Sequence, residues 1–249
     1  MAKENIIYGI RPILEAIREG KTIEKLLLQT NISNDGIKNI KEELKQEGQN
    51  PKIQYVPIEK LNSLTRVGNH QGVVAVTSLV EYSLLEDVIE ECLNSNNQPF
   101  VVMLDHITDV RNLGAIARTC ECAGATCLVV PEEGSAAINE DAIKTSAGAL
   151  LRLPICKIRN TKSTLNYLRQ MGLKIYSASE KANHLYYEQD FKEGFILIMG
   201  AEDRGVSKDA LKMSDELIRI PINGEIESLN VSVAAGVIIY EAVKQRNIK

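Results

Sequence analysis

The residues Ile220-Pro-Ile-Asn-Gly-Glu-Ile-Glu-Ser-Leu-Asn-Val-Ser-Val-Ala-Ala-Gly236 form the most informative stretch of this 249-residue chain. A strand-like run reaches Ile220, a polar Asn-Gly turn follows, and a helical pattern begins after Asn230. Ser228 and Asn230 are both of a type that caps helix N-termini, but one helix start explains only one of them. The helix is apolar nearly all round and has small residues at 234–236, so it must be covered on every side. We expect a sheet on one side and a second subunit on the other.

Residues 99–249, which contain this stretch, alternate buried strands with helices. The strand patterns lack polar alternation, which is typical of a parallel sheet covered on both faces, and they span residues 100–104, 127–130, 174–178 and 195–199. This alternation predicts a Rossmann-like α/β domain. The fingerprint G-x-G-x-x-G is absent after the first strand, which argues against an NAD-dependent dehydrogenase. No Lys-Ser or Lys-Thr follows Gly205, which argues against a nucleotide triphosphatase.

Residues 1–77 predict a separate, smaller α/β domain. Strand patterns at 23–28, 53–56 and 72–76 alternate with helical patterns, and this alternation indicates a compact αβ sandwich. Residues 78–98 contain one short amphipathic helical pattern and then a polar loop closed by Pro99, so we interpret them as a linker.

Composition excludes several classes of protein. The formal net charge of -4 argues against a protein that binds nucleic acid through bulk positive charge. Five cysteines without a C-x-x-C pair predict reduced thiols, and the three scattered histidines predict no metal site. No apolar run is long enough to span a bilayer, and Met1–Asn5 lacks the apolar core of a signal peptide. We therefore expect a cytoplasmic protein without a membrane partner.

Two further polar motifs follow predicted strands, at the edge where open α/β sheets bind ligands. The first is Asn112-x-Gly114-x-x-x-Arg118, in which Asn112 is expected to begin a helix and Arg118 to project away from its apolar face. The second is Gly200-x-Glu202-x-x-Gly205, in which Gly200 lets bare backbone approach a ligand. Taken alone, Arg118 fits an ordinary surface charge and the second motif fits a plain strand-to-helix turn.

Together, the three motifs resemble those of the SpoU (TrmH-like) RNA 2'-O-ribose methyltransferases of the SPOUT superfamily, in the same order across residues 105–236. The resemblance implies a C-terminal trefoil knot, S-adenosyl-L-methionine as cofactor, RNA as substrate and a homodimer built on the terminal helix. It places the cofactor at backbone groups of Gly200, Ile220 and Leu229. It places the chemistry at Arg118, with Asn112, Glu202, Ser228 and Asn230 around it. Val110 departs from the proline that many members carry, which affects only the expected stiffness of the loop.

Over its whole length the chain most resembles the RlmB-type subfamily, which methylates a guanosine ribose of large-subunit (23S) rRNA. The N-terminal domain resembles the L30e/L7Ae-type RNA-binding domain, most clearly at Asn69-His70-Gln71-Gly72-Val73-Val74-Ala75. Transfer RNA is the nearest competing substrate. A non-catalytic RNA-binding factor for ribosome assembly on the same scaffold is the alternative from another class. The intact Arg118, Glu202 and Asn230 argue against that alternative.

The residue types in the motifs restrict the mechanism. Methyl transfer to a ribose hydroxyl needs in-line placement and stabilisation of a developing alkoxide. The motifs contain no histidine or cysteine, and an arginine side chain keeps its proton in proteins, so it is a poor literal base. We hypothesise that Arg118, close to a substrate phosphate, stabilises the alkoxide and helps the proton to depart. The other four residues would orient the ribose and the arginine.

Overall fold

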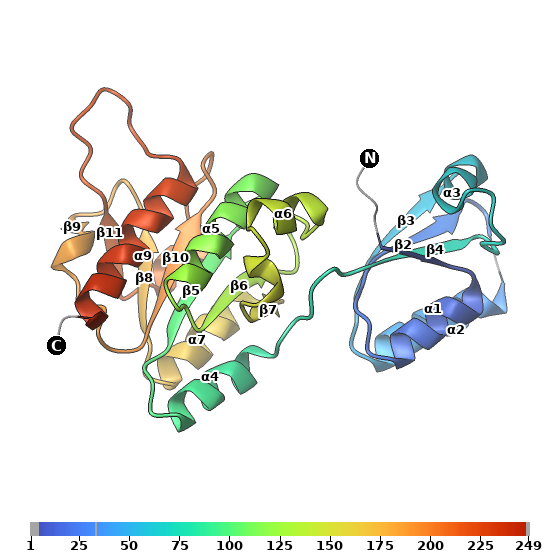
Figure 1. Cartoon of the computed structure of the whole chain (residues 1–249), viewed down its shortest axis with the longest axis horizontal. Helices are drawn as coiled ribbons and strands as arrows, with labels where there is room; N and C mark the ends of the chain where they lie inside the picture. The colour runs from blue at the N-terminus through green and yellow to red at the C-terminus, as the bar shows by residue number, and fades with distance from the viewer. Residues whose placement is uncertain (1–4, 33, 248–249) are drawn as a thin grey trace. The chain divides into compact units, whose positions relative to one another are not determined.

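The computed structural model describes residues 5–32 and 34–247 (Figure 1). Met1–Glu4, to which the expectation about a signal peptide applies, lie outside the described residues. The chain divides into two compact units, Met1–Glu81 and Tyr82–Lys249. No helix in the described ranges has the length and apolar character needed to cross a membrane.

A four-stranded sheet forms the centre of the N-terminal unit. Its order is β1-β4-β2-β3, with only β2 and β3 parallel, and its strands are β1 (Ile6–Tyr8), β2 (Ile23–Gln29), β3 (Lys52–Val56) and β4 (Val73–Thr77). The helices are α1 (Ile10–Arg18), α2 (Asp35–Gln46) and α3 (Ile58–Thr65). Leu26 and Leu28 share one apolar cluster with α1 and α2, whereas Leu27 shares another with α3. Successive side chains of β2 thus face helices on opposite sides of the sheet.

A seven-stranded sheet, parallel at every described pairing, forms the centre of the C-terminal unit. Its order is β7-β6-β5-β10-β8-β11-β9. The strands are β5 (Phe100–Asp105), β6 (Cys127–Pro131), β7 (Ile155–Ile158), β8 (Lys174–Ala178), β9 (His184–Leu185), β10 (Phe195–Gly200) and β11 (Glu216–Arg219). The expected buried parallel sheet is confirmed. The sequence patterns missed the short strands β1, β7 and β9.

The position of β10 departs from the strand order 3-2-1-4-5-6 of a Rossmann fold. β10 pairs with β5 on one side and with β8 on the other, although β8 precedes it in the chain. β10 therefore lies between two strands that both come before it in the chain. The strand order reverses at β5 and β10, and ligands of open α/β sheets bind at the carboxyl ends of strands beside such a reversal.

Helices cover both faces of this sheet (Figure 1). The helices are α4 (Leu85–Asn94), α5 (Val110–Cys122), α6 (Glu140–Thr145), α7 (Thr161–Gln170), α8 (Lys208–Met213) and α9 (Val231–Asn247). Apolar residues of α4, α7 and α8 share one core cluster with alternate residues of β5 and β10. Helix α9 packs against α5 as well as against β10, and a Cβ built at Gly236 would lie 4.0 Å from the Thr119 methyl group. The sheet expected on one side of α9 is present at β10, and α9 also packs against the helix α5, which the sequence did not predict.

The C-terminal end of α9 is anchored by Arg246. Its guanidinium donates hydrogen bonds to the backbone carbonyls of Gln98, Pro99, Phe191 and Glu193, and it lies 5.0 Å from the Phe195 ring centroid. Burial lowers the pKa of Arg246, but an arginine remains charged. The last turn of α9 is thereby fixed to the amino-terminal edge of the sheet, opposite the edge that carries the polar motifs.

Gly114 sets the spacing between α5 and α6. A Cβ at this position would lie 2.8 Å from the Thr145 Cβ and 2.9 Å from the Ala142 carbonyl oxygen. We predict that Gly114→Val lowers the free energy of unfolding by about 2–3 kcal/mol through overpacking, measured by urea denaturation. Gly224→Val is the matched control, because a Cβ at Gly224 meets nothing within 4 Å. Equal losses in the two variants would contradict the close approach of these helices.

Candidate functional site

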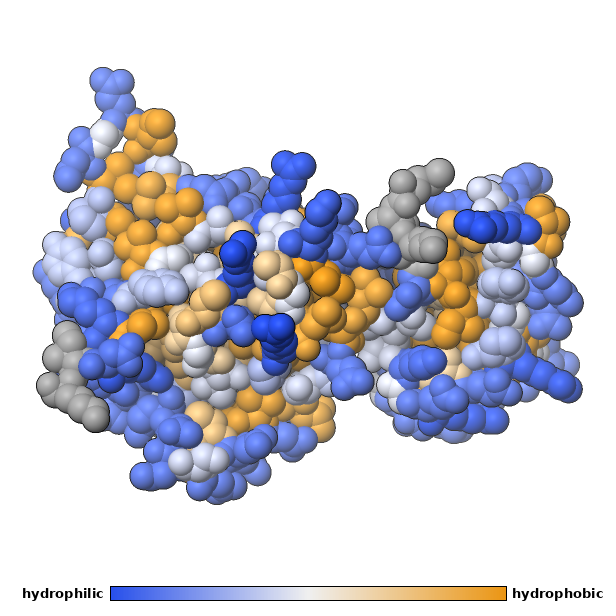
Figure 2. Space-filling view, viewed as in Figure 1, coloured by the Kyte–Doolittle hydropathy of each residue, from blue (hydrophilic) through white to orange (hydrophobic). Residues whose placement is uncertain are grey.

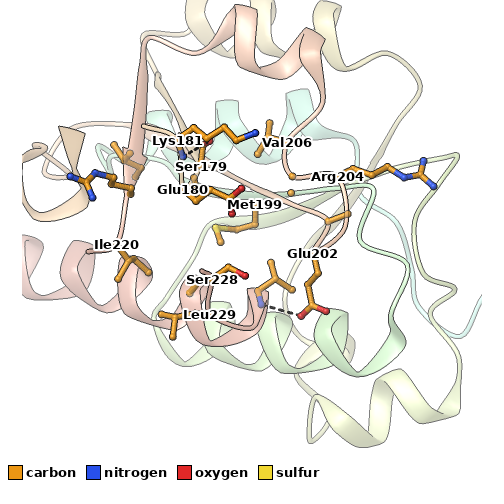
Figure 3. A pocket seen from close by; sticks show the side chains of 18 of the residues that line it. Ser179, Glu180, Lys181, Met199, Glu202, Arg204, Val206, Ile220, Ser228 and Leu229 are labelled. Atoms are coloured by element: carbon orange, nitrogen blue, oxygen red, sulfur yellow. Dashed lines mark hydrogen bonds between the residues drawn. The ribbon is translucent and has the colours of Figure 1, made fainter. Parts of the chain in front are cut away.

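A cavity of about 330 Å³ opens at the carboxyl ends of the central strands (Figure 3). Segments that are far apart in the sequence form its wall: the residues after β8, the β10–α8 loop, the segment from β11 to Leu229, and the first turns of α9. Five predicted residues line it: Gly200, Glu202, Ile220, Ser228 and Leu229. Asn112, Arg118 and Asn230 are not among the lining residues.

A hydrogen-bonded cluster at the edge of the cavity joins the three sequence motifs. Glu202 Oε1 accepts from Asn230 Nδ2 at 2.6 Å, from Asn112 Nδ2 at 3.2 Å and from the Val231 backbone N–H at 3.3 Å. Asn230 Nδ2 also donates to Asn112 Oδ1 at 3.0 Å. One carboxylate oxygen therefore fixes the first turns of α5 and α9 relative to the loop that follows β10.

Asn230 caps α9 and joins the cluster at the same time. Its Oδ1 accepts from the backbone N–H groups of Ser232 and Val233, as a helix cap does, while its Nδ2 is directed to Asn112 and Glu202. Ser228 lies outside this cap and lines the cavity, where Figure 3 shows it beside Leu229 and on the same side as Glu202. Capping thus accounts for one of the two residues, as the sequence indicated.

Asn112 does not begin its helix, and this expectation is wrong. The cap of α5 is Asp109, whose Oδ1 accepts from the backbone N–H groups of Arg111 (2.7 Å) and Asn112 (2.9 Å). The helix starts at Val110, two residues earlier than expected. Because Asp109 satisfies these backbone groups, the side chain of Asn112 is left to bind Glu202 and Asn230.

The protein's own backbone gives a further reason for glycine at position 200, besides the expected approach of a ligand. A Cβ at Gly200 would lie 2.2 Å from the backbone of Gly205 and Val206, so a side chain is excluded by the protein's own turn. Gly205 has φ +67 and donates its N–H to the Ala201 carbonyl at 2.8 Å, which closes that turn. The two glycines of this motif thus shape one wall of the cavity.

Arg118 lies apart from this cluster. It follows Asn112 by six residues, which is about 9 Å along an α-helix and about 240° around it. Its side chain is exposed, and no hydrogen bond or ion pair joins it to another residue in the described part of the chain. The structure therefore brings Asn112, Glu202 and Asn230 together but leaves Arg118 on the neighbouring surface of α5.

Asp105 is a residue of the site that the sequence patterns did not single out. It ends β5, is fully buried, and accepts from the Ser207 backbone N–H at 2.6 Å through Oδ2. Its Oδ1 lies 2.7 Å from His106 Nδ1. The backbone of His106 has a φ of +62. Asp105 thereby holds the end of the β10–α8 loop, which lines the cavity. Its position at the end of an apolar strand was the available signal, but its partner lies 102 residues away.

The cavity is mixed in polarity. Met199, Ile218 and Leu211 supply apolar wall, and Glu180, Lys181, Arg219 and Glu227 supply charge. Figure 3 shows Ser179, Glu180 and Lys181 across Met199 from Ser228 and Leu229. The Arg204 side chain points away from the cavity and pairs with Asp203 at 3.1 Å. Among the described residues, no group of three or more His, Cys, Asp or Glu side chains is placed to hold a metal ion.

Comparison with protein families gives two matches that together span most of the chain. Residues 99–240 match the model described as the SpoU rRNA Methylase family. Residues 6–83 match the model described as RNA 2'-O ribose methyltransferase substrate binding.

Curated proteins and a solved structure show similarity over nearly the full length. The putative TrmH family tRNA/rRNA methyltransferase YacO of Bacillus subtilis strain 168 is 31% identical, with 98% of this chain and 97% of that protein covered. The 23S rRNA (guanosine-2'-O-)-methyltransferase RlmB of Ralstonia nicotianae is 30% identical, with coverage of 100% and 98%. The AdoMet-bound rRNA methyltransferase of Sinorhizobium meliloti is 24% identical, with a TM-score of 0.61 and coverage of 97% and 87%. The last similarity is one of fold.

Asp105 provides a test of how the cavity wall is held. Asp105→Ala leaves the partly buried Ser207 N–H without its acceptor, so we predict a loss of about 1–3 kcal/mol in the free energy of unfolding. Asp105→Asn keeps one acceptor oxygen and should lose less. Thermal or urea denaturation measures both, with the exposed Asp209→Ala as control. If Asp105→Ala lost no more stability than Asp209→Ala, the bond to Ser207 would not hold the loop.

Proposed function

The chain belongs to the SpoU rRNA methylase family, and we propose that it methylates the ribose 2'-hydroxyl of a guanosine in 23S rRNA. The observation that carries this proposal is the meeting of Asn112, Glu202 and Asn230, one from each motif, beside a cavity at the strand ends. The curated relatives named as 23S rRNA guanosine-2'-O-methyltransferases support the choice of nucleotide and RNA.

S-adenosylmethionine is the cofactor, and the cavity has the features that such a molecule requires. Its volume of about 330 Å³ lies in the range of small-molecule pockets, roughly 300–1,000 Å³. Apolar side chains such as Met199 and Ile218 offer surface to an adenine ring, and Glu180 and Glu227 offer negative charge to a cationic ligand. We place backbone contacts at Gly200, Ile220 and Leu229. When bound, the cofactor supplies a methyl group carried on a positively charged sulfur.

The chain's own side chains orient the acceptor in this proposal. Ser228 lines the cavity beside the cluster, where a hydroxyl can bind the incoming ribose. Asn112, Glu202 and Asn230 hold one another through three hydrogen bonds, and the Val231 N–H donates a fourth to Glu202, so they meet the ribose already in place. Arg118 contributes a fixed positive charge that stabilises the developing alkoxide, while the proton leaves to a substrate phosphate or to water. The absence of a described partner for Arg118 suits a residue that binds RNA.

The remaining expectations about architecture are part of the same proposal. A trefoil knot in the C-terminal unit is supported by the family and by β10, which enters the sheet between two strands that precede it in the chain. An L30e/L7Ae-like N-terminal domain is supported by the mixed sheet with helices on both faces. A cytoplasmic location is supported by the RNA substrate.

A homodimer across α9 is also proposed. The loop before α9 is exposed at every residue from 221 to 230, and Ile226 is 78% exposed. Val233 and Tyr240 of α9 are exposed as well. Figure 2 shows a large apolar area where this loop and α9 lie. Exposed apolar surface of this kind favours a protein partner. Thr119, the neighbour of Arg118, approaches Gly236, so such a dimer would bring Arg118 near the interface.

Two alternatives remain distinct from this proposal. Transfer RNA as substrate is favoured by the relative named as a tRNA/rRNA methyltransferase. A non-catalytic assembly factor would bind RNA through the same fold without transferring a methyl group. The intact cluster around Glu202 argues against the second alternative, because binding alone does not require it.

Methylation assays test the function directly. Purified full-length protein is incubated with labelled S-adenosylmethionine and either unmodified 23S rRNA or unmodified tRNA, and the ribose-methylated nucleosides of the digested product are mapped. We predict label in one 2'-O-methylguanosine of the 23S rRNA. Label in tRNA would keep the chemistry and change the substrate. No label with intact cofactor binding would favour the assembly factor, and no cofactor binding would refute the proposal.

Arg118 is the residue whose proposed role in catalysis can best be tested separately from cofactor binding. We predict that Arg118→Ala lowers kcat by at least about 100-fold, the usual loss when one stabiliser of a developing charge is removed. The dissociation constant for S-adenosylmethionine, measured by calorimetry, should stay within about twofold, because Arg118 does not line the cavity. Lys208→Ala, at another exposed cation, is the control. Loss of cofactor binding in Arg118→Ala would contradict the assignment.

A further inference from the structure

His106, the residue that follows β5, holds an unusual backbone conformation beside the cavity. Its φ is +62, in the left-handed region where residues other than glycine are uncommon. Its side chain is 46% exposed. The preceding residue, Asp105, pairs in the sheet with Gly200, which lines the cavity. Because adjacent strands lie about 4.8 Å apart, His106 comes directly after a residue that neighbours the cavity wall.

Two neighbours restrain the imidazole ring of His106. Nδ1 lies 2.7 Å from Oδ1 of Asp105, whose side chain is fully buried. A Cβ built at Gly134 would lie 2.6 Å from Cδ2 of the ring, so the absence of a side chain there leaves the space that the ring occupies. The Ala136 N–H donates to the Ile107 carbonyl at 2.8 Å, which keeps this loop in place. The ring is thus held at Nδ1 and restrained at Cδ2.

This arrangement determines which ring nitrogen is available to a ligand. The Asp105 carboxylate accepts from the Ser207 N–H through Oδ2, and it accepts from His106 through Oδ1, so the ring hydrogen is assigned to Nδ1. In the neutral ring the other nitrogen, Nε2, then has a free lone pair. No hydrogen bond joins Nε2 to another residue in the described part of the chain. His106 therefore offers one hydrogen-bond acceptor in a fixed position.

The surroundings of His106 favour a ligand that donates hydrogen bonds. The segments 105–109 and 132–139 contain no lysine or arginine, and they carry the exposed Asp109 and Glu133. Glu132 pairs with Arg159 at 3.1 Å. A phosphate at His106 would meet a lone pair and negative charge, and neither segment supplies the cation that phosphates usually bind. An imino or amino N–H group, in contrast, can bind the free lone pair directly.

We propose that His106 selects the target base by accepting a hydrogen bond at Nε2 from the Watson–Crick edge of guanine. Guanine has an imino N1–H and an amino group on this edge, whereas adenine has an acceptor at N1 and no amino group at C2. Proteins commonly read this edge on unstacked RNA bases. The inference rests on the proposed function and adds the group that selects guanosine.

The position of the acceptor ribose in the proposed reaction brings the base to this place. The ribose carbon that carries the 2'-hydroxyl is bonded to the carbon that carries the base. A ribose held by Asn112 and Ser228 therefore keeps its base at the carboxyl edge of the sheet, where His106 follows β5. Backbone strain that buried neighbours impose is typical of functional sites, and it gives the φ of His106 a purpose.

Substitutions at position 106 separate base recognition from structural support. His106→Asn keeps an amide that can donate to Asp105 in place of Nδ1, and asparagine tolerates positive φ, but it has no atom at the place of Nε2. His106→Gly removes the whole ring without backbone strain. His184→Asn is the matched control, because His184 is also exposed beside a carboxylate, 3.8 Å from Glu216, and does not line the cavity.

The experiment compares two RNAs that differ only in the target base. Splinted ligation gives a 23S rRNA fragment with guanosine or adenosine at the position that wild-type protein methylates, and kcat/KM is measured on each with full-length protein. We expect wild type to prefer guanosine at least about threefold. Both variants of His106 should lower kcat/KM for the guanosine RNA about threefold to tenfold and stay within about twofold for the adenosine RNA, the effect of one lost hydrogen bond. His184→Asn should behave as wild type.

The ratio of the two rates decides the inference. A residue that only supports the fold, or that takes the proton from the hydroxyl, would lower kcat/KM for both RNAs by the same factor, and this result would overturn the inference. Equal rates of wild type on the two RNAs would also overturn it. The proposed function stands in both cases, because RNA is still methylated.

Two further outcomes concern the proposed function itself. If wild-type protein methylates only tRNA, the proposed substrate fails, and the same comparison at the tRNA position decides the inference. Methylation of no RNA refutes the proposed function and this inference with it. The melting temperature of His106→Asn and its Kd for S-adenosylmethionine should stay near wild type, because Asp105 keeps a donor.

Discussion

The site of this protein depends on one carboxylate oxygen, Glu202 Oε1, which accepts three hydrogen bonds from two helices. Its side-chain partners Asn112 and Asn230 are 90 and 28 residues away in the sequence. Even to a charged acceptor, hydrogen bonds contribute only about 1.5–3 kcal/mol each, and exposure to water weakens these, so they do not by themselves hold the fold together. Their effect is specificity: they select one arrangement of α5, α9 and the β10–α8 loop from those that the apolar packing alone would allow.

Two other groups keep that arrangement in place from a distance. Asp105 fixes the β10–α8 loop through the Ser207 N–H, in a buried position where losing an acceptor is costly. Arg246 fixes the far end of α9 through four backbone carbonyls. Because α9 is held at both ends, Asn230 at its start has little freedom to move along the helix axis. A charged transition state is stabilised best by groups that are already in position, and in the proposed reaction this anchoring would supply them.

The sequence predicted most of this fold where the signal was local. Long apolar strands such as Phe100–Leu104 could be recognised alone, whereas β7 has only four residues, one of them Lys157, and was missed. The place of β10 between β5 and β8 could not be predicted, because strand order depends on pairings that no single segment encodes. The same limit applies to Asp105, whose partner is remote.

The motifs located the cavity, but the interactions that explain individual residues could be identified only from the structure. Asn112 was expected to begin a helix that Asp109 in fact caps, and Gly200, which was expected to make room for a ligand, also makes room for Gly205 and Val206. In both cases residue type identified an important position, while the interacting atoms came from elsewhere in the chain.

The exposed apolar residues near the cavity fall into two groups, and this division indicates what covers each. Ile222 and Leu229 line the cavity, so a ligand that fills it would remove them from water. Ile226, Val233 and Tyr240 are exposed and are not among the lining residues. A bound cofactor therefore leaves the second group uncovered, and burying it requires a macromolecular surface. Because α9 lies beside α5, a second subunit on that surface would also cover the part of α5 next to Arg118. The proposed dimer and the proposed catalytic arginine thus depend on the same face of the molecule.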